Sequence, residues 1–378
     1  MTRGGIDELS KTWRGRYLRA SREQKTQILD EFVALTGYHR KSAIRLLLNG
    51  RRRRSRDRRG RPVVYTNEVK AALITVWEVC GQICSKRLVP FLPEIVDVLE
   101  RHGELWLTDE ARELLHRLSP ATMDRLLATQ RRRYGRGRCT TKPGTLLRES
   151  IPIRTFAEWD DAVPGFMELD LVAHCGETTA GEYLNTLNGV DVVTSWCEPV
   201  ALANRSQHAV QEAVEKMRCR LPYPLLGLDS DNDVMFINHN LARSCKQEKI
   251  TFTRCRPYKK NDQAHVEQKN WTAVRQVVGY QRYESEEALA LLEAIYEDLR
   301  LYLNFFQPVR KVVAKERTGS KVHKIYDRAQ TPYRRVLACP QVSDEVKGKL
   351  ETVFASLNPV VLRKQIDDNL RELWRLPR

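Results

Sequence analysis

Three acidic side chains stand where apolar runs end or where an amphipathic segment begins, and this pattern most constrains the fold. Asp170 lies in the run MELDLV, and Asp231 comes at the end of the apolar run that starts at Leu225. Glu267 lies near the start of a long amphipathic segment, and 35 residues separate it from Asp231. Short apolar runs predict buried strands, and apolar residues three and four apart predict a helix. The pattern therefore predicts an α/β domain in which two strands and a helix carry carboxylates that can converge on divalent metals.

The expected order of elements can be followed from residue 165 to residue 306. Three strand-like runs cover 165–172, 182–190 and 197–203, and a helical segment follows at 206–218. Further along the chain, the pattern predicts a strand at 225–228, a helix at 238–249, a strand at 250–253, the Glu267 helix at 263–278 and a long amphipathic helix at 285–306. Periodicity alone gives a mixed α/β domain and leaves the topology open.

Asp170, the Ser230-Asp231-Asn232 turn, Pro257 and the segment from Asn261 to Glu267 resemble the D,D(35)E signature. That signature belongs to retroviral integrases and to bacterial insertion-sequence transposases with an integrase-type core. The resemblance extends over residues 156–308. It implies a ribonuclease-H-like catalytic core, an α/β fold with a mixed five-stranded sheet and flanking helices. It also implies the catalytic and metal-binding residues, which are Asp170, Asp231 and Glu267.

The resemblance implies a metal-dependent reaction on DNA. Two Mg²⁺ ions, with Mn²⁺ as a substitute, would be held by the three carboxylates, because hard cations prefer oxygen ligands. Two such ions assist both the attacking and the leaving oxygen of a phosphodiester. The family's activity is that of a DNA transposase or integrase, which binds element terminal repeats, cuts them and joins them to target DNA as a homodimer or higher oligomer. Asp229, Asp233 and Asp262 are near competitors as metal ligands. Asp231 is chosen for the second position because the turn and the spacing match there.

Basic charge is concentrated at the N-terminus. The chain has a net charge of +16, and residues 1–66 hold 18 Lys and Arg against 6 Asp and Glu. Such an excess favours a polyanionic partner. Residues 21–49 contain a capping box at Ser21 and Gln24, a break at Gly37 and a basic second helix, which is the pattern of a helix-turn-helix. An ordinary helical hairpin is the alternative.

The domain organisation follows from these segments. We expect a helix-turn-helix DNA-binding module at 1–50, a basic linker at 51–66, a second helical module at 67–130, a basic linker at 131–150, the catalytic core at 151–308 and a C-terminal tail region at 309–378. The helices at 67–130 predict either a second helix-turn-helix or a packing bundle. The side chains expected to contact DNA are Arg40, Lys41, Arg45, Arg51, Arg52, Arg53, Arg54, Arg131, Arg132, Arg133, Arg254, Lys259, Lys260, Asn261, Gln268 and Lys269.

Other features narrow the function class. No apolar run reaches the roughly 18 residues of a membrane span, and the nine cysteines form no CxxC pair. We therefore expect reduced thiols in a cytoplasmic, nucleoid-associated bacterial protein with no membrane partner. Trp271 could stack on a base, although burial in the core is favoured. Two alternative functions stay open: a structure-selective nuclease on the same fold, and a transposase-derived DNA-binding regulator with an inactive core, against which the intact triad argues.

Overall fold

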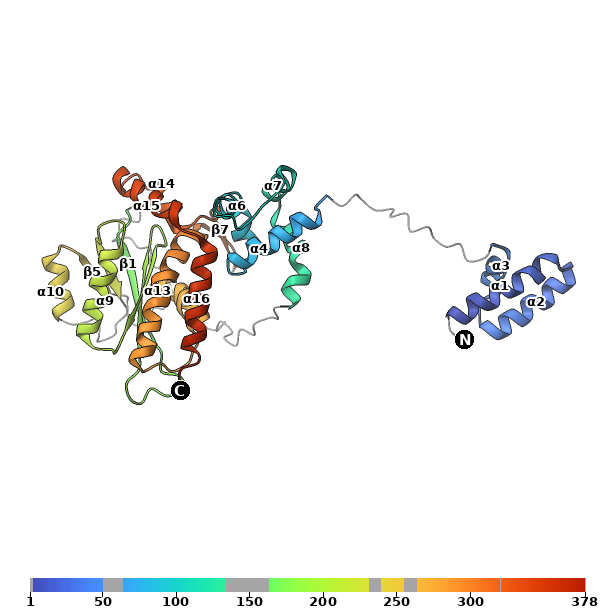
Figure 1. Cartoon of the computed structure of the whole chain (residues 1–378), viewed down its shortest axis with the longest axis horizontal. Coiled ribbons are helices and arrows are strands. Elements are labelled where there is room, and N and C mark those ends of the chain that lie inside the picture. Colours follow the sequence, from blue (N-terminus) through green and yellow to red (C-terminus); the bar gives the residue numbers. More distant parts are fainter. Residues whose placement is uncertain are drawn as a thin grey trace. The chain divides into compact units, whose positions relative to one another are not determined.

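The structure is a computed structural model that describes residues 3–49, 64–133, 163–230, 239–254, 264–319 and 321–377. The chain divides into two compact units, Met1–Val64 and Tyr65–Arg378 (Figure 1). Within the described ranges, no helix combines the length and the apolar character that crossing a membrane requires. The seven cysteines in these ranges are free thiols.

The first unit contains three helices: α1 (Arg3–Arg19), α2 (Arg22–Thr36) and α3 (Arg40–Asn49). The capping box at Ser21 and Gln24 is confirmed, because each side chain accepts a hydrogen bond from the other residue's backbone. Gly37 ends α2 with a φ of 71°, a left-handed conformation that glycine adopts at least cost. The expected helix, break and basic helix are therefore present, and α1 was not expected. These helices pack around Ile28, Phe32, Ala43 and Leu47.

The second unit is built on a mixed five-stranded sheet with the strand order β3-β2-β1-β4-β5. The strands are β1 (Phe166–Ala173), β2 (Asn185–Asp191), β3 (Cys197–Leu202), β4 (Gly227–Ser230) and β5 (Thr251–Arg254). β2 is antiparallel to both β1 and β3, whereas β4 is parallel to both β1 and β5. With α9 (Gln207–Arg220), α10 (His239–Gln247) and α11 (Ala264–Lys269), the chain follows the expected order of strands and helices.

Side chains alternate between the two faces of β1, and this alternation decides where the acidic residues lie. Met167 and Leu169 are buried in one hydrophobic cluster with residues of α9 and α10. Glu168 and Asp170 therefore point to the opposite face. That face carries α11 and the long helix α13 (Glu286–Phe306), and Figure 1 shows α9 and α13 on opposite sides of the sheet.

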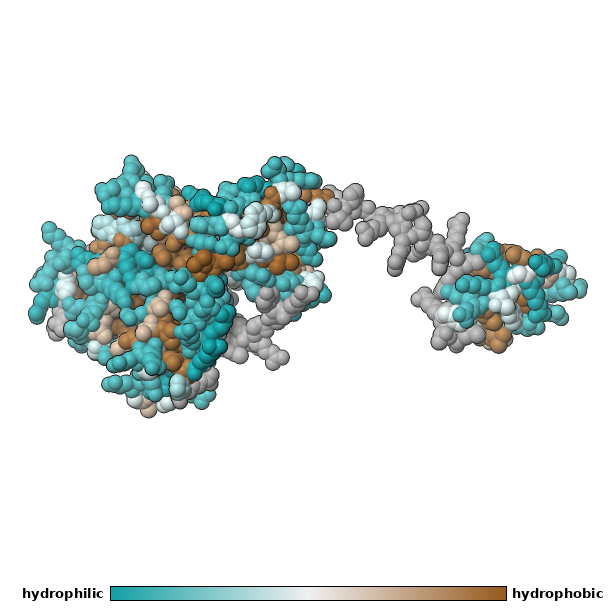
Figure 2. Space-filling model, viewed as in Figure 1, coloured by the Kyte–Doolittle hydropathy of each residue, from teal (hydrophilic) through white to brown (hydrophobic). Residues whose placement is uncertain are grey.

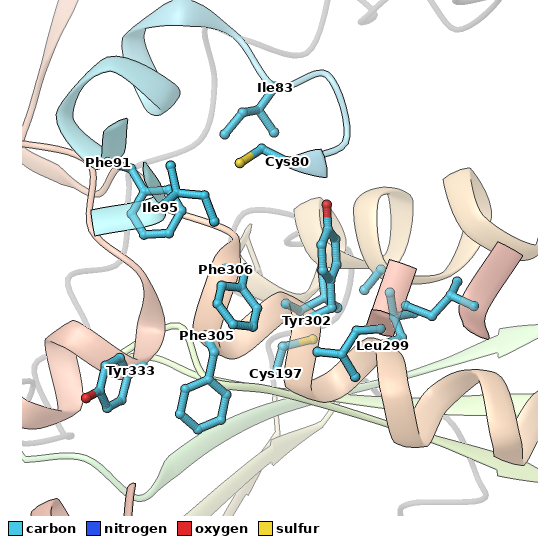
Figure 3. Close-up of a cluster of buried hydrophobic side chains, with 14 of the residues drawn as sticks. Cys80, Ile83, Phe91, Ile95, Cys197, Leu299, Tyr302, Phe305, Phe306 and Tyr333 are labelled. Atoms are coloured by element: carbon cyan, nitrogen blue, oxygen red, sulfur yellow. The ribbon is translucent and has the colours of Figure 1, made fainter. Parts of the chain in front are cut away.

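The helices before the sheet do not form a separate core. They are α4 (Asn67–Val79), α5 (Ser85–Leu88), the short 3₁₀ helix η1 (Val89–Phe91), α6 (Leu92–Arg101), α7 (Asp109–His116) and α8 (Pro120–Arg133). The Tyr302 hydroxyl donates to the Val79 carbonyl at 2.7 Å, and the Gln307 amide donates to the Cys80 carbonyl at 2.9 Å. Figure 3 shows Cys80, Ile83, Phe91 and Ile95 in one cluster with Tyr302, Phe305 and Phe306 of α13. For residues 67–130, the structure therefore shows a bundle packed on the sheet domain.

The C-terminal region completes the same core. It contains the hairpin of β6 (Val312–Thr318) and β7 (Lys321–Tyr326), followed by α14 (Pro332–Ala338), α15 (Asp344–Ser356) and α16 (Pro359–Leu373). α16 packs along α13 through buried side chains that recur three and four residues apart, namely Leu362, Ile366, Leu370 and Leu373. Hydrophilic residues cover most of the visible outer surface of these helices (Figure 2). The hairpin was not expected, because its alternation of apolar and charged residues is short.

Candidate active site

Two of the three predicted metal ligands lie in the described part of the chain. Asp170 is half-buried on β1, and Glu267 is exposed on α11. Asp231 lies outside the described residues. Within the described ranges, no group of three His, Cys, Asp or Glu side chains is close enough together to hold a metal ion. Asp170 and the helix of Glu267 are held together by hydrogen bonds.

Three hydrogen bonds fasten the Glu267 helix along β1. The backbone N–H of Val266 donates to the Glu168 carboxylate at 2.9 Å, and the Asn270 amide donates to Asp170 Oδ2 at 2.5 Å. Further along, Arg275 donates to the Ala173 carbonyl at 2.8 Å. Glu267 lies in the chain between the first and second of these contacts. The helix that carries Glu267 is therefore fixed against the strand that carries Asp170.

A π-helical segment allows two of these contacts. α11 continues as η3 (Asn270–Arg275), which is a π-helix, and then as α12 (Gln276–Val278). In an α-helix, residues five apart are rotated by about 140° around the axis. Asn270 and Arg275 are five apart, and both reach β1. The wider turn of the π-helix brings both side chains to the strand, and such π segments occur frequently at functional sites.

Asn270 connects Asp170 to the neighbouring strand. Asn188 is the cross-strand partner of Asp170, and its amide donates to Asn270 Oδ1 at 2.8 Å. The Cys197 thiol donates in turn to Asn188 Oδ1 at 3.3 Å. Asp170 also accepts from the backbone N–H of Leu171 at 2.8 Å. The orientation of the Asp170 carboxylate is thus set by a chain of hydrogen bonds that connects three strands and a helix.

Asp229, the alternative to Asp231 as the second metal ligand, forms a hydrogen bond within the sheet. It is 7% exposed and accepts a hydrogen bond from the Thr253 hydroxyl of β5 at 2.7 Å. On the other side of β4, Asp229 pairs in register with Glu168, and Ser230 pairs with Leu169. Asp229 therefore lies inside the sheet beside a second carboxylate. Leu169 and Ser230 are the residues that immediately precede Asp170 and Asp231 in the sequence.

Lys269 requires a correction. We expected it to contact DNA phosphates, but only 9% of its surface is exposed. Burial lowers the pKa of Lys269, while the nearby Cys197 raises it and Arg87 lowers it. A side chain enclosed between the sheet and the α5 region does not offer its amine to DNA at the surface. The sequence showed a basic residue on the helix of Glu267 but not which way its side chain points.

The other expected DNA contacts divide into three groups. In the first unit, Arg40, Lys41 and Arg45 are exposed on α3, and Arg40 forms an ion pair with Asp30. At the end of α8, Arg132 is exposed, whereas Arg131 pairs with Asp124 at 2.7 Å and lies over the Trp77 ring. The remaining residues lie outside the described residues, or their side chains do: Arg51, Arg52, Arg53, Arg54, Arg133, Arg254, Lys259, Lys260, Asn261 and Gln268.

Glu168, Asn188 and Asn270 are the site residues that sequence reasoning missed. Glu168 is fully buried and lies two residues before Asp170, so strand alternation already put both carboxylates on one face. Asn270 follows Glu267 by three residues, which is the spacing of neighbours on a helix surface. Those two signals were present in the sequence. No local signal pointed to Asn188, because its role depends on the pairing of β1 with β2.

His174 lies at the end of β1 and shows how tightly this region is packed. Its side chain is fully buried, and Nε2 is 2.7 Å from the Thr186 hydroxyl, which lies 2.7 Å from the Tyr296 hydroxyl. Burial first, and the charge of Arg275 second, lower the pKa of His174 from 6.5 to about 3. The folded protein therefore keeps His174 neutral at pH values where the unfolded chain would protonate it.

We expect this histidine to make the protein sensitive to mild acid. Below its ordinary pKa of 6.5, the unfolded state binds a proton that the folded state does not. The free energy of unfolding should therefore fall by about 2 kcal/mol between pH 7 and pH 5 on account of His174. Urea unfolding at both pH values measures this. His174→Gln should lose the dependence, and substitution of the exposed His208 by Gln should keep it. An equal pH dependence in wild type and His174→Gln would contradict the assignment.

The structure defines a class of protein: a mixed five-stranded α/β core with acidic residues on strand β1 and on helix α11, which packs against it. No family model matches the chain. The chain is 43% identical over 333 residues to the uncharacterized protein y4rM of Sinorhizobium fredii (strain NBRC 101917 / NGR234), and the match covers 86% of this chain and 93% of that protein. The chain belongs to the same family as y4rM.

Solved structures give a weaker likeness. The catalytic core domain of BIV integrase is 19% identical, with a TM-score of 0.30, and the match covers 46% of this chain and 94% of that one. The HTLV-2 integrase catalytic core domain in complex with magnesium, in its dimeric form, is 13% identical with a TM-score of 0.29, covering 39% of this chain and 91% of that one. At these TM-scores, the description of the fold rests on the strand order and register of the sheet.

Proposed function

We propose that this protein is a DNA transposase or integrase that cuts the ends of a mobile element and joins them to target DNA. The observation that carries the proposal is the fastening of the Glu267 helix to β1. Asn270 donates to Asp170, and Val266, directly before Glu267, donates to Glu168. These contacts fix the helix that carries Glu267 on the face of the sheet that carries Asp170. This supports a site in which a strand carboxylate and a helix carboxylate converge, as metal-assisted phosphodiester chemistry needs.

Asp231 is the third member of the proposed site. It follows Ser230, the last residue of β4, and Ser230 is paired in register with Leu169, the residue before Asp170. Paired strands lie about 4.8 Å apart. This continuity of the chain supports a common site for Asp170 and Asp231. Asp229 is already engaged with Thr253, which favours Asp231 over it.

The donor set fits Mg²⁺, because carboxylate oxygens are the ligands that this hard cation prefers. In the proposed site, Asp170, Asp231 and Glu267 would hold two ions, with Mn²⁺ as a substitute. Bound there, the ions would reduce the electrostatic repulsion between the phosphate and the attacking oxygen, and they would assist the attacking and leaving oxygens. The protein's own contribution is orientation: Asn270 and the Leu171 N–H hold the Asp170 carboxylate at both of its oxygens.

The reaction has two steps on this proposal. Water attacks a phosphorus atom at the element end, and the strand leaves with a free 3′-hydroxyl. That hydroxyl then attacks a phosphorus atom of the target, and the target strand leaves with a 3′-hydroxyl of its own. We propose that the basic face of α3, with Arg40, Lys41 and Arg45, contacts the element ends. Pairing two ends requires at least a dimer.

A joining assay tests the proposal. The full chain is mixed with a duplex carrying the gene's own flanking DNA, a supercoiled target plasmid and Mg²⁺ or Mn²⁺, and the products are sequenced. We expect joined ends with a short, constant target duplication, and we expect Asp231→Asn and Glu267→Gln to lower joining by at least about 1,000-fold. The matched control is Glu286→Gln, the same change at the start of α13.

The assay also separates the alternatives. Metal-dependent nicks without joints would contradict a transposase and favour a structure-selective nuclease on the same fold. DNA binding with no product, equal in wild type and variants, would favour a DNA-binding regulator. Joining that survives in Asp231→Asn and Glu267→Gln would show that the carboxylates have been assigned wrongly.

A further inference from the structure

Two aromatic rings face solvent on the helix that carries Glu267 and on the turn that follows it. Trp271, in η3, is 49% exposed, and Tyr280, just after α12, is 61% exposed. Their ring centroids are 6.4 Å apart, and their planes are inclined by 44°. We had favoured a buried role for Trp271, and its exposure corrects that expectation. Large aromatic side chains have much to gain from burial, so an exposed pair indicates contact with another molecule.

The Gly279 turn and the Arg275 side chain hold the pair in place. Gly279 has a φ of 78°, and the chain turns there after α12 to bring Tyr280 beside Trp271. The Arg275 guanidinium lies over the Tyr280 ring at 4.7 Å and donates to the Ala173 carbonyl of β1 at 2.8 Å. The rings are therefore fixed relative to the strand of Asp170, and a cation lies next to them.

The pair also lies next to the proposed active site. Trp271 directly follows Asn270, whose amide donates to Asp170 Oδ2 at 2.5 Å. Neighbouring Cα atoms are about 3.8 Å apart. Glu267 precedes Trp271 by four residues. A DNA strand whose phosphate reaches Asp170 would therefore place its adjacent nucleotides within reach of these rings.

We propose that Trp271 and Tyr280 form a stacking site for an unpaired base of the DNA strand that is cut or joined. This inference rests on the proposed function and adds a substrate property, namely that the DNA end is opened next to the reacting phosphate. Bases in a paired duplex are covered by their neighbours, whereas an unpaired base exposes its ring faces to aromatic side chains. Every base has such a face, so the site tolerates any sequence. The Arg275 cation favours a polyanion beside the rings.

A second copy of the chain fits the Trp271–Tyr280 pair less well than an unpaired base does. A stable protein interface buries about 800 Å² on each partner. An aromatic side chain contributes about 150–250 Å² even when it is fully buried, and these two rings are already partly covered. The flanking residues Asn270 and Arg275 are polar and bonded to β1. The size of the patch suits a single base.

The test compares the affinity for two duplexes of the same flanking sequence in Ca²⁺, measured by fluorescence anisotropy with the full chain. One duplex is fully paired, and the other has three mismatches at the expected cut and 2-aminopurine in the unpaired strand. We expect wild type to prefer the mismatched duplex by about 10-fold and to quench its 2-aminopurine. Trp271→Ala and Tyr280→Ala should lose most of the preference, and Trp271→Phe should keep most of it. Trp374→Ala is the matched control, because Trp374 is 47% exposed.

The outcomes are separable from those of the joining assay. A preference that depends on Trp271, in a protein that neither cuts nor joins, would support the stacking site and overturn the proposed function. Joining by wild type together with an unchanged preference in Trp271→Ala would overturn the stacking site alone. If Trp271→Ala instead abolishes self-association in sedimentation and leaves the DNA preference intact, the pair is a protein contact and the inference fails.

Discussion

Substituting Arg300 by methionine is expected to lower the free energy of unfolding by about 3–5 kcal/mol. Arg300, on α13, donates from Nε to Glu198 Oε2 at 2.6 Å and from Nη2 to Oε1 at 3.1 Å. Glu198 lies on β3 and is fully buried. Methionine keeps much of the aliphatic volume of arginine but leaves the carboxyl without its cation. The loss arises from an uncompensated buried charge, and urea unfolding followed by circular dichroism measures it.

The pH dependence of this loss tests its cause. Burial raises the pKa of Glu198, and Arg300 is the main group that lowers it. Without Arg300, the folded state holds a proton on Glu198 at pH values where the unfolded chain releases it, so stability falls as the pH rises above the ordinary value of 4.5. The deficit of Arg300→Met should therefore be larger at pH 8 than at pH 5. An equal deficit at both pH values would contradict the buried-charge account.

Two control variants complete this experiment. In the double variant Glu198→Gln with Arg300→Met, the neutral amide can still accept from Trp196, which donates to Glu198 at 2.7 Å in wild type. We expect it to recover at least about 2 kcal/mol of the loss, because replacing both charges of a buried pair costs less than breaking the pair. Arg218 pairs with Glu215 and Glu248 at the surface, and Arg218→Met should cost less than about 1 kcal/mol.

Changing Asn270 to aspartate is expected to reduce strand joining about 100-fold while the protein stays folded. Aspartate has the same shape and can still accept the hydrogen bond from Asn188. It loses the N–H that Asn270 donates to Asp170 and places a second negative charge beside it. The misoriented carboxylate should lower kcat more than it changes KM for DNA, since Asn270 acts through Asp170. Joining assays at saturating metal and DNA measure this.

The pH profile separates a positioning role from a merely structural one. As the pH falls from 8 to 6, the two facing carboxylates can share a proton, and the protonated aspartate can again donate to Asp170. Joining by Asn270→Asp should therefore recover in part at the lower pH relative to wild type. Asn204→Asp is the matched control, since Asn204 is exposed and its side chain contacts the backbone of Ser206. A uniform loss across the pH range would argue that Asn270 only supports the fold.

Much of the fold could be predicted because its determinants are local. The strands and helices between residues 165 and 306 appear in the expected order, with ends displaced by at most a few residues. The capping box of Ser21 and Gln24 and the turn at Gly37 depend on residues three or four positions apart. Periodicity and capping report such short-range preferences directly. The α/β class of the core and the helical N-terminal unit were therefore accessible from the residues alone.

The candidate site could be predicted only in part from the sequence, because some of its determinants are not local. Asp170 and Glu267 stand out because strand ends and helix starts can be read locally. The contact between Asn270 and Asp170 joins residues 100 positions apart, and the contact between Val266 and Glu168 joins residues 98 positions apart. No pattern within one segment reports such a pairing. The burial of Lys269 and the exposure of Trp271 likewise depend on how a π-helical turn rotates side chains against β1.

Between residues 165 and 306, the sequence by itself determined which segments become strands and helices, where they begin and end to within a few residues, and which acidic residues stand near their ends. These features depend on neighbours along the chain. Only the tertiary structure decided that residues 67–133 and the C-terminal helices share a core with the sheet. Only it decided that one helix is fastened to β1 by Glu168, Asp170 and the Ala173 carbonyl. The physical reason is that burial and long-range hydrogen bonds depend on which surfaces meet in the folded chain, and residues far apart in sequence supply the two sides.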